Sequence, residues 1–177
     1  MNITVYLGAC EGCDPQLKQT VRELGTWIGT SGNSLVYGGS KTGLMGELAS
    51  AALEAGAEVT GVEPQFFVDS VLQLEGLTRL IVTPDIAQRK AKMIELGDAF
   101  VAFPGGTGTL EEISQIMSMI GLGQLDAPCV FYNLNGYYNP MAEQLDRMLA
   151  CDLTSPERLQ GISFARNLDE LVACLQA

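Results

Sequence analysis

The residues best suited to chemistry lie in one stretch, residues 104–112, which reads PGGTGTLEE. It follows a short apolar run, residues 99–103, that has the length of a buried strand. It precedes residues 113–120, which contain no Gly or Pro and have the length of a helix. A Gly-rich turn of this kind leaves backbone N–H groups exposed at the positive end of a helix dipole. The stretch therefore predicts a site for an anion, most often a phosphate, with the acidic pair Glu111 and Glu112 close by.

Glu112 has two interpretations. A carboxylate this close to a phosphate-type turn is suited to catalysis on whatever carries the phosphate. Alternatively, Thr109-Leu110-Glu111-Glu112 matches a capping box, in which Thr109 caps the helix and Glu112 hydrogen-bonds back to it. Because the turn is so near, we favour catalysis and keep the cap as the alternative.

A second Gly-rich turn, YGGSKTGLMG at residues 37–46, follows another apolar run. It is not a Walker A loop, because Ser40 separates Gly39 from Lys41. The first apolar run is not followed by GxGxxG either, so a dinucleotide cofactor is poorly supported. Gly39 is a candidate ligand contact, and tight turning alone is the alternative.

Three of the ten basic residues fall within four positions, at Arg89, Lys90 and Lys92. Such a run usually forms a solvated helix face. It begins just after a predicted strand, however, so Arg89 could reach the same edge as Glu112. A phosphate or base contact by Arg89 or Lys90 is then expected.

These residues must be positioned by alternating strands and helices. Strands are predicted at 3–7, 34–37, 58–62, 79–82, 99–103, 128–132 and 161–165. Helices are predicted at 14–28, 43–53, 85–96, 110–122, 139–150 and 167–175, and residues 64–76 are interpreted as a mobile loop over the site. The pattern predicts an α/β, doubly wound, mostly parallel Rossmann-like sheet with helices on both faces, in a single nucleotide-binding domain spanning residues 1–177. Ligands bind such sheets at the carboxyl ends of the strands, where both Gly-rich turns should meet.

Composition excludes several function classes. The net charge of −11 argues against a nucleic-acid polymer as partner, and the absence of His excludes a His-ligated metal. No apolar run is long enough to span a membrane, and the N-terminus does not resemble a signal peptide, so we expect a cytoplasmic protein.

The five cysteines indicate reduced thiols, because an odd number cannot pair completely. Cys10 and Cys13 have the spacing of a redox motif or half a zinc site, but a second ligand pair is missing. We interpret them as a coincidental pair in a loop and keep a thioredoxin-type role as the alternative.

The two Gly-rich turns, together with Gln88-Arg89-Lys90 and Met93, resemble the Lonely Guy (LOG) family. Its members are cytokinin riboside 5′-monophosphate phosphoribohydrolases, many once mislabelled as lysine decarboxylases. The resemblance runs from the first strand to about Tyr132. It implies that Arg89 and Glu112 are catalytic, and the substrate and phosphate contacts that it implies are Gly39, Lys90, Gly105, Gly106, Thr107, Gly108 and Thr109. The chain departs from the family pattern at Ser40 and Ile86, which bears on base preference more than on the reaction.

By this resemblance we expect hydrolysis of the N-glycosidic bond of an adenosine 5′-monophosphate, whose base is adenine or an N6-modified adenine. No metal or organic cofactor is implied. The resemblance also implies a homodimer, and the apolar circumference of residues 110–122 fits either a core or a subunit interface. The alternative function is a non-catalytic carrier of a phosphorylated cofactor of the molybdenum cofactor type.

Overall fold

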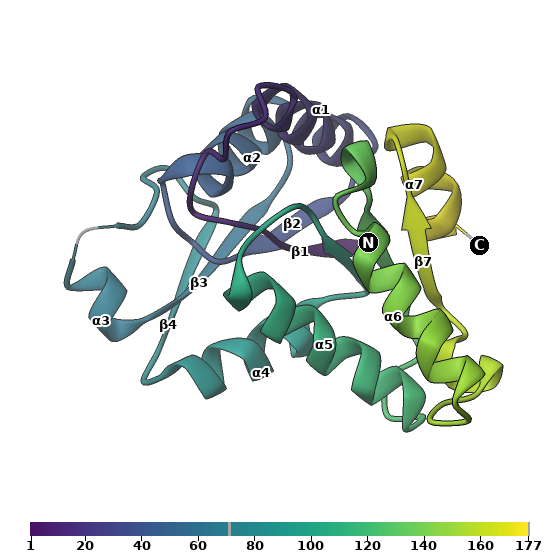
Figure 1. Cartoon of the computed structure of the whole chain (residues 1–177). Helices are drawn as coiled ribbons and strands as arrows, with labels where there is room; N and C mark the ends of the chain where they lie inside the picture. Colours follow the sequence, from purple (N-terminus) through teal and green to yellow (C-terminus); the bar gives the residue numbers. More distant parts are fainter. Residues whose placement is uncertain (71, 177) are drawn as a thin grey trace.

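Parallel strands form one seven-stranded sheet in the computed structural model, which describes residues 1–70 and 72–176 (Figure 1). The strands are β1 (Asn2–Tyr6), β2 (Ser34–Tyr37), β3 (Val59–Pro64), β4 (Arg79–Thr83), β5 (Ala99–Ala102), β6 (Cys129–Tyr132) and β7 (Ile162–Ala165). Their order is β4-β3-β2-β1-β5-β6-β7, and every pairing is parallel. This confirms the predicted doubly wound α/β fold.

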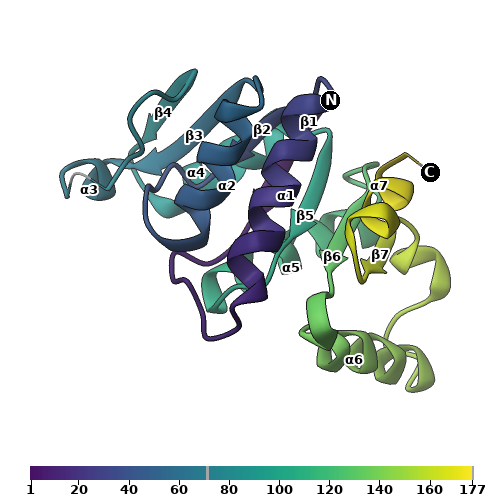
Figure 2. The same cartoon turned by 90° about the horizontal axis from the view of Figure 1, so that it is seen from above.

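Helices cover both faces of the sheet (Figures 1 and 2). The helices are α1 (Gln16–Thr30), α2 (Gly43–Glu54), α3 (Gln65–Val68), α4 (Ile86–Leu96), α5 (Thr107–Gly121), α6 (Asn139–Ala150) and α7 (Leu168–Gln176), with 3-10 turns at Leu134–Gly136 and Pro156–Leu159. One apolar cluster joins α1, α2 and α7 to the sheet, and another joins α4, α5 and the start of α6 to the opposite face. Because both faces are covered, the central strands are apolar on both sides, and β5 (AFVA) is buried throughout.

Helices α1 and α2 pack unusually closely because α1 presents glycines to its neighbour. A Cβ atom added to Gly25 would lie 2.4 Å from the Leu48 carbonyl oxygen, and one added to Gly29 would lie 2.6 Å from the Ala55 Cβ. The two helices therefore depend on the missing side chains for their separation.

The structure differs from the sequence expectations mainly at strand and helix ends. Strand β3 continues to Pro64, past the predicted end at Val62, because it pairs with β4 as far as Thr83. Helix α1 begins at Gln16 and has Pro15 at its N-cap, not at its first helical position.

The expected loop at residues 64–76 contains the short helix α3. Beyond it, the Lys41 N–H donates to the Leu72 carbonyl and the Leu74 N–H donates to the Gly39 carbonyl, so this segment is tied to the first Gly-rich turn. The interpretation of residues 64–76 as a loop was therefore wrong for Gln65–Val68, which form α3. Residue 71 of that loop lies outside the described residues.

Among the helices of the described chain, none combines the length and the hydropathy that a membrane crossing requires.

Gly25→Ala tests the close packing of α1 on α2. We expect the melting temperature to fall by at least about 2 °C, because overpacking costs ~1–3 kcal/mol and each kcal/mol shifts Tm by ~2–4 °C at this chain length. Gly108→Ala is the matched control, since no atom lies within 4 Å of its added Cβ. Equal melting temperatures of the two variants, measured by calorimetry, would contradict this packing role.

Candidate active site

The candidate site lies where the connections of the sheet change direction. Strand β1 is flanked by β2 and β5, and the chain winds outward in one direction from β1 to β4 and in the other from β5 to β7. The segments that follow β1 and β5 therefore separate at the carboxyl ends of these strands and leave a crevice there.

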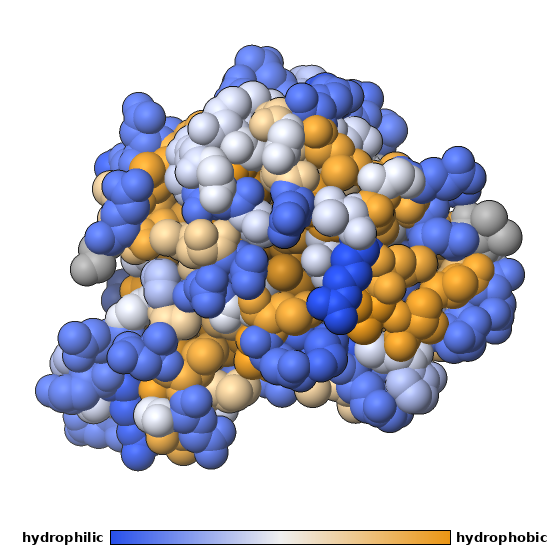
Figure 3. Space-filling view, turned by 180° about the vertical axis from the view of Figure 1, so that it is seen from behind, coloured by the Kyte–Doolittle hydropathy of each residue, from blue (hydrophilic) through white to orange (hydrophobic). Residues whose placement is uncertain are grey.

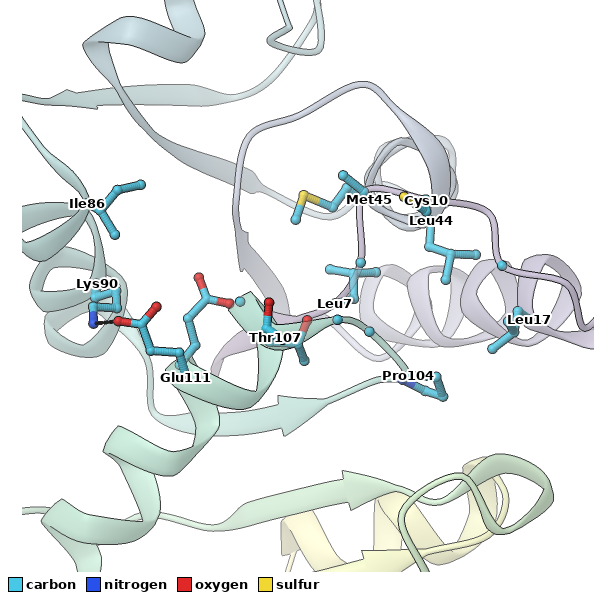
Figure 4. A pocket seen from close by; sticks show the side chains of 18 of the residues that line it. Leu7, Cys10, Leu17, Leu44, Met45, Ile86, Lys90, Pro104, Thr107 and Glu111 are labelled. Atoms are coloured by element: carbon cyan, nitrogen blue, oxygen red, sulfur yellow. Dashed lines mark hydrogen bonds and ion pairs between the residues drawn. The ribbon is translucent and has the colours of Figure 1, made fainter. Parts of the chain in front are cut away.

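A cavity of about 550 Å³ occupies this crevice, a size typical of small-molecule sites (Figure 4). Its walls come from the segment after β1, the starts of α2, α4 and α5, and single side chains of α1, α3 and the 134–138 region. Figure 4 shows Leu7, Leu44 and Met45 on one side of the cavity and Lys90 with Glu111 on another. The cavity thus combines an apolar wall with a charged one.

The start of α5, called the anion cradle below, presents its first backbone N–H groups to this cavity. Gly106 occupies the N-cap without a side-chain hydrogen bond, and no acidic residue lies in the first turn. The N–H groups of that turn and the positive end of the helix dipole are therefore available to a ligand. All five residues predicted for this turn, Gly105 to Thr109, line the cavity.

Glycine is required at position 105 because the turn lies against the segment after β1. A Cβ on Gly105 would lie 2.2 Å from the Thr109 Oγ1 and 2.8 Å from the Gly8 backbone nitrogen. The Tyr137 hydroxyl donates to the Gly105 carbonyl at 2.6 Å and holds the turn from the other side. The turn is thus positioned before any ligand arrives.

Arg89 and Glu112, which are far apart in sequence, form a buried ion pair at the cavity. The Arg89 Nη1 donates to the Glu112 Oε1 at 2.6 Å, and the Arg89 Nε donates to the Val62 carbonyl at 2.9 Å. The side chains are only 10% and 9% exposed. Helix α4 supplies Arg89 and begins at an Asp85 N-cap, as predicted, with the Gln88 N–H donating to the Asp85 carboxylate.

The capping-box interpretation of Glu112 was wrong. The helix begins at Thr107, three residues earlier than that motif requires, so Thr109 is its third residue and not its cap. The Glu112 carboxylate binds Arg89 from another helix. Its position therefore follows from the ion pair and not from a local helix signal.

Two other predicted ligand residues fall in different places. Lys90 lines the cavity and pairs with Glu111 (Figure 4). Gly39 is not among the residues that line the cavity. It has a φ of 87°, and a Cβ there would lie 2.4 Å from the Glu63 Cγ. Its turn conformation and its contact with Glu63 account for the glycine.

Sequence reasoning missed Glu63 and Tyr137. Glu63 is buried, with 1% exposure, although it is a charged residue in the mostly apolar strand β3. A single acidic residue inside an apolar run was the available signal. Tyr137 had no such signal, because only the folded chain brings its hydroxyl to Gly105.

Burial controls the protonation of this region. It raises the pKa of the Glu112 carboxyl, and Arg89 opposes that rise through its charge and hydrogen bond. Burial likewise raises the pKa of the Glu63 carboxyl, again opposed by Arg89. The pKa of the nearby Tyr6 phenol is also raised, first by burial and then by Glu112, so this hydroxyl stays neutral.

The described residues include no group of three or more His, Cys, Asp or Glu side chains placed to hold a metal ion. Cys10 lines the cavity, and both Cys10 and Cys13 are exposed free thiols.

Comparison with known proteins places this site in context. A family model described as possible lysine decarboxylase matches residues 45–175. The chain is 37% identical over 177 residues to the cytokinin riboside 5′-monophosphate phosphoribohydrolase of Rhodococcoides fascians, covering 99% of this chain and 89% of that protein. It is 35% identical over 174 residues to an enzyme of the same name from Arabidopsis thaliana, covering 98% and 82%.

Solved structures resemble the fold at lower sequence identity. The molybdenum cofactor binding protein of Rippkaea orientalis gives a TM-score of 0.71 at 19% identity, covering 99% of this chain and 94% of that one. The Moco carrier protein of Chlamydomonas reinhardtii gives 0.73 at 23% identity, with coverages of 99% and 94%. At these identities the likeness shows the fold alone.

Glu63→Met tests the cost of the buried carboxyl. Because its pKa is raised above the ordinary value of 4.5, the folded state binds the proton more tightly than the unfolded state. The free energy of unfolding should therefore fall as pH rises from about 4.5 through the raised pKa. The Glu63→Met variant should lose this contribution to the pH dependence of unfolding and should have a higher Tm at neutral pH. Thermal unfolding across this pH range measures both effects.

The control is Glu95→Met, which should leave the pH dependence unchanged, because the Glu95 side chain is 64% exposed. A lower Tm of Glu63→Met at neutral pH would contradict the assignment of Glu63 as a destabilising buried acid.

Proposed function

We propose that this chain hydrolyses the N-glycosidic bond of an N6-modified adenosine 5′-monophosphate, because it belongs to the Lonely Guy family of cytokinin riboside 5′-monophosphate phosphoribohydrolases. The products are the free base and ribose 5-phosphate. The observation that carries this proposal is the buried Arg89–Glu112 pair. It shares one cavity with the N-terminus of α5, which no side chain caps.

The start of α5 is proposed to hold the 5′-phosphate. Gly105, Gly106, Gly108 and Thr109 line the cavity at this point, and Thr107 is the first helical residue. Backbone N–H groups held in a fixed turn bind the phosphate with little reorganisation, which fixes the ribose for reaction. Lys90, on the charged wall, is proposed as a further substrate contact.

Glu112 and Arg89 are proposed to carry out the cleavage. Water attacks C1′ of the ribose while the bond to the base nitrogen breaks, and the water's proton balances the electron pair that leaves with the base. The transition state resembles an oxocarbenium ion. Glu112 either stabilises that cationic ribose or positions the water, and Arg89 orients the nucleotide and assists departure of the base.

The apolar wall supports an N6-modified base. Leu44, Met45, Phe67 and Ile86 line the cavity and come from three different helices, α2, α3 and α4. An isoprenoid substituent on the base would bury apolar surface against such a wall, whereas unmodified adenine would not use it fully.

We further propose a cytoplasmic homodimer. Leu110 and Leu122 on α5 are exposed by 42% and 64%, and several apolar residues of α3, β4 and the start of α4 are also exposed. Figure 3 shows apolar surface gathered on the side of the molecule where α3 and β4 lie. Exposed apolar area of this kind supports an interface between subunits.

The net charge of −11 is unfavourable for binding a nucleic-acid polymer.

Glu112→Gln tests the reaction with isopentenyladenosine monophosphate and with AMP as substrates. Glutamine keeps the size of the side chain but lacks the negative charge, so kcat should fall by at least about 100-fold while the protein stays folded. Ribose 5-phosphate release measures the rate, and circular dichroism checks the fold.

Glu95→Gln is the matched control, because this exposed residue of α4 pairs only with Lys92 among the described residues. It should retain wild-type kcat. A folded Glu112→Gln with unchanged kcat would remove the proposed catalytic role. Tight nucleotide binding by wild type without any base release would instead favour the carrier function.

The assembly proposal predicts a mass near twice that of the 18.9 kDa chain in sedimentation experiments at micromolar concentration. A single species at the chain mass over this concentration range would contradict the homodimer.

A further inference from the structure

The Glu63 carboxyl is buried without a hydrogen-bond partner, an environment that is rare for a carboxylate. The residue is 1% exposed, and among the described residues no hydrogen-bond donor contacts either of its side-chain oxygens. Burying an ionised group without a partner destabilises the folded state by roughly several kcal/mol. Such groups are therefore usually paired or replaced by apolar residues. Glu63 is the penultimate residue of strand β3, beside the candidate site, where a costly group is most easily explained by function.

Glu63 and the Arg89 side chain lie against the same Gly-rich turn. The Arg89 Nε donates to the carbonyl of Val62, the residue immediately before Glu63. A Cβ on Gly38 would lie 2.5 Å from the Arg89 Nη2, and a Cβ on Gly39 would lie 2.4 Å from the Glu63 Cγ. Two consecutive glycines therefore make room for the two side chains on neighbouring sides of one turn.

Arg89 is the cation that two buried carboxyls share. Its charge acts on Glu112, to which it is hydrogen-bonded, and also on Glu63, to which it is not. The titratable groups that act on Glu63 are Arg89 from α4 and the buried Tyr37 phenol from β2. One guanidinium neutralises the charge of one carboxylate, so a second buried carboxylate without a hydrogen bond to it is destabilised.

We propose that Glu63 is a positioning residue that accepts the Arg89 guanidinium when Glu112 turns to the substrate. Its catalytic meaning rests on the proposed phosphoribohydrolase function. In the resting protein Glu112 is the hydrogen-bonded partner of Arg89, and burial favours the protonated form of Glu63. When the guanidinium moves to Glu63, the Glu63 proton leaves to solvent, and no covalent bond forms or breaks in this step.

The exchange solves a problem that the ion pair creates. A carboxylate held by Arg89 at 2.6 Å has part of its charge neutralised, so it stabilises a cationic ribose less well. Releasing Glu112 would leave the buried Arg89 without a carboxylate partner, which is strongly unfavourable. A second carboxylate within reach of Arg89 removes that cost and frees Glu112 for the reaction.

A double-mutant cycle with Glu112→Gln and Glu63→Gln tests the exchange without any substrate. In Glu112→Gln, Arg89 should pair with Glu63, so the loss of Tm should be small. The double variant leaves Arg89 without a carboxylate. The decrease in its Tm should exceed the sum of the decreases in the two single variants by at least about 4 °C. Additive effects would overturn the proposal.

A crystal structure of Glu112→Gln tests directly whether Arg89 pairs with Glu63. The Arg89 guanidinium should lie within hydrogen-bond distance of the Glu63 carboxylate. A guanidinium still directed at position 112, with Glu63 unpartnered, would overturn the proposal.

Kinetics test the role in turnover. Glu63→Gln should lower kcat about tenfold with little change in KM, and Glu63→Asp should restore part of the rate because it keeps the charge. Glu54→Gln, an exposed residue of α2, is the control and should match wild type. Unchanged kcat in Glu63→Gln would overturn the proposal. If wild type itself releases no base, the proposed function fails, whereas the cycle and the crystal structure still decide the exchange.

Discussion

The ion pair between Arg89 and Glu112 is the interaction on which the site depends. It joins α4 to α5 across the carboxyl ends of the strands and draws charge into a region with little solvent. Such a pair is stable only where the geometry is held firmly on both sides. Here the Asp85 N-cap fixes the start of α4, and the Gly105 turn fixes the start of α5.

The parallel sheet determines where this pair can form. Because β1 and β5 are neighbours, the segments that follow them meet, and Gly8 and Gly105 approach closely enough to exclude a side chain. The same arrangement turns the N-terminus of α5 into the cavity, so an anion cradle and a buried carboxylate share one space. Family membership and geometry thus support the same chemistry through independent observations.

The sequence was sufficient for the fold, and the predicted residues around Gly105 to Thr109, Arg89 and Glu112 lie together at one cavity. Alternation of apolar runs with helical segments predicted the sheet, and the turn at 104–109 predicted the anion cradle, because both signals are local. Glu112 was harder, since a capping box and a catalytic carboxylate share one local pattern. The helix start at Thr107 and the contact with Arg89 rule out the capping box. Glu63 and Tyr137 were missed because their roles arise from contacts between distant segments.

Product analysis with wild-type protein and isopentenyladenosine monophosphate tests the central claim most directly. The account predicts free N6-isopentenyladenine and ribose 5-phosphate in equal amounts. Nucleoside with inorganic phosphate would instead show cleavage of the phosphate ester. Either that outcome or recovery of the intact nucleotide from a protein that binds it would contradict an N-glycosidic hydrolase built on Arg89 and Glu112.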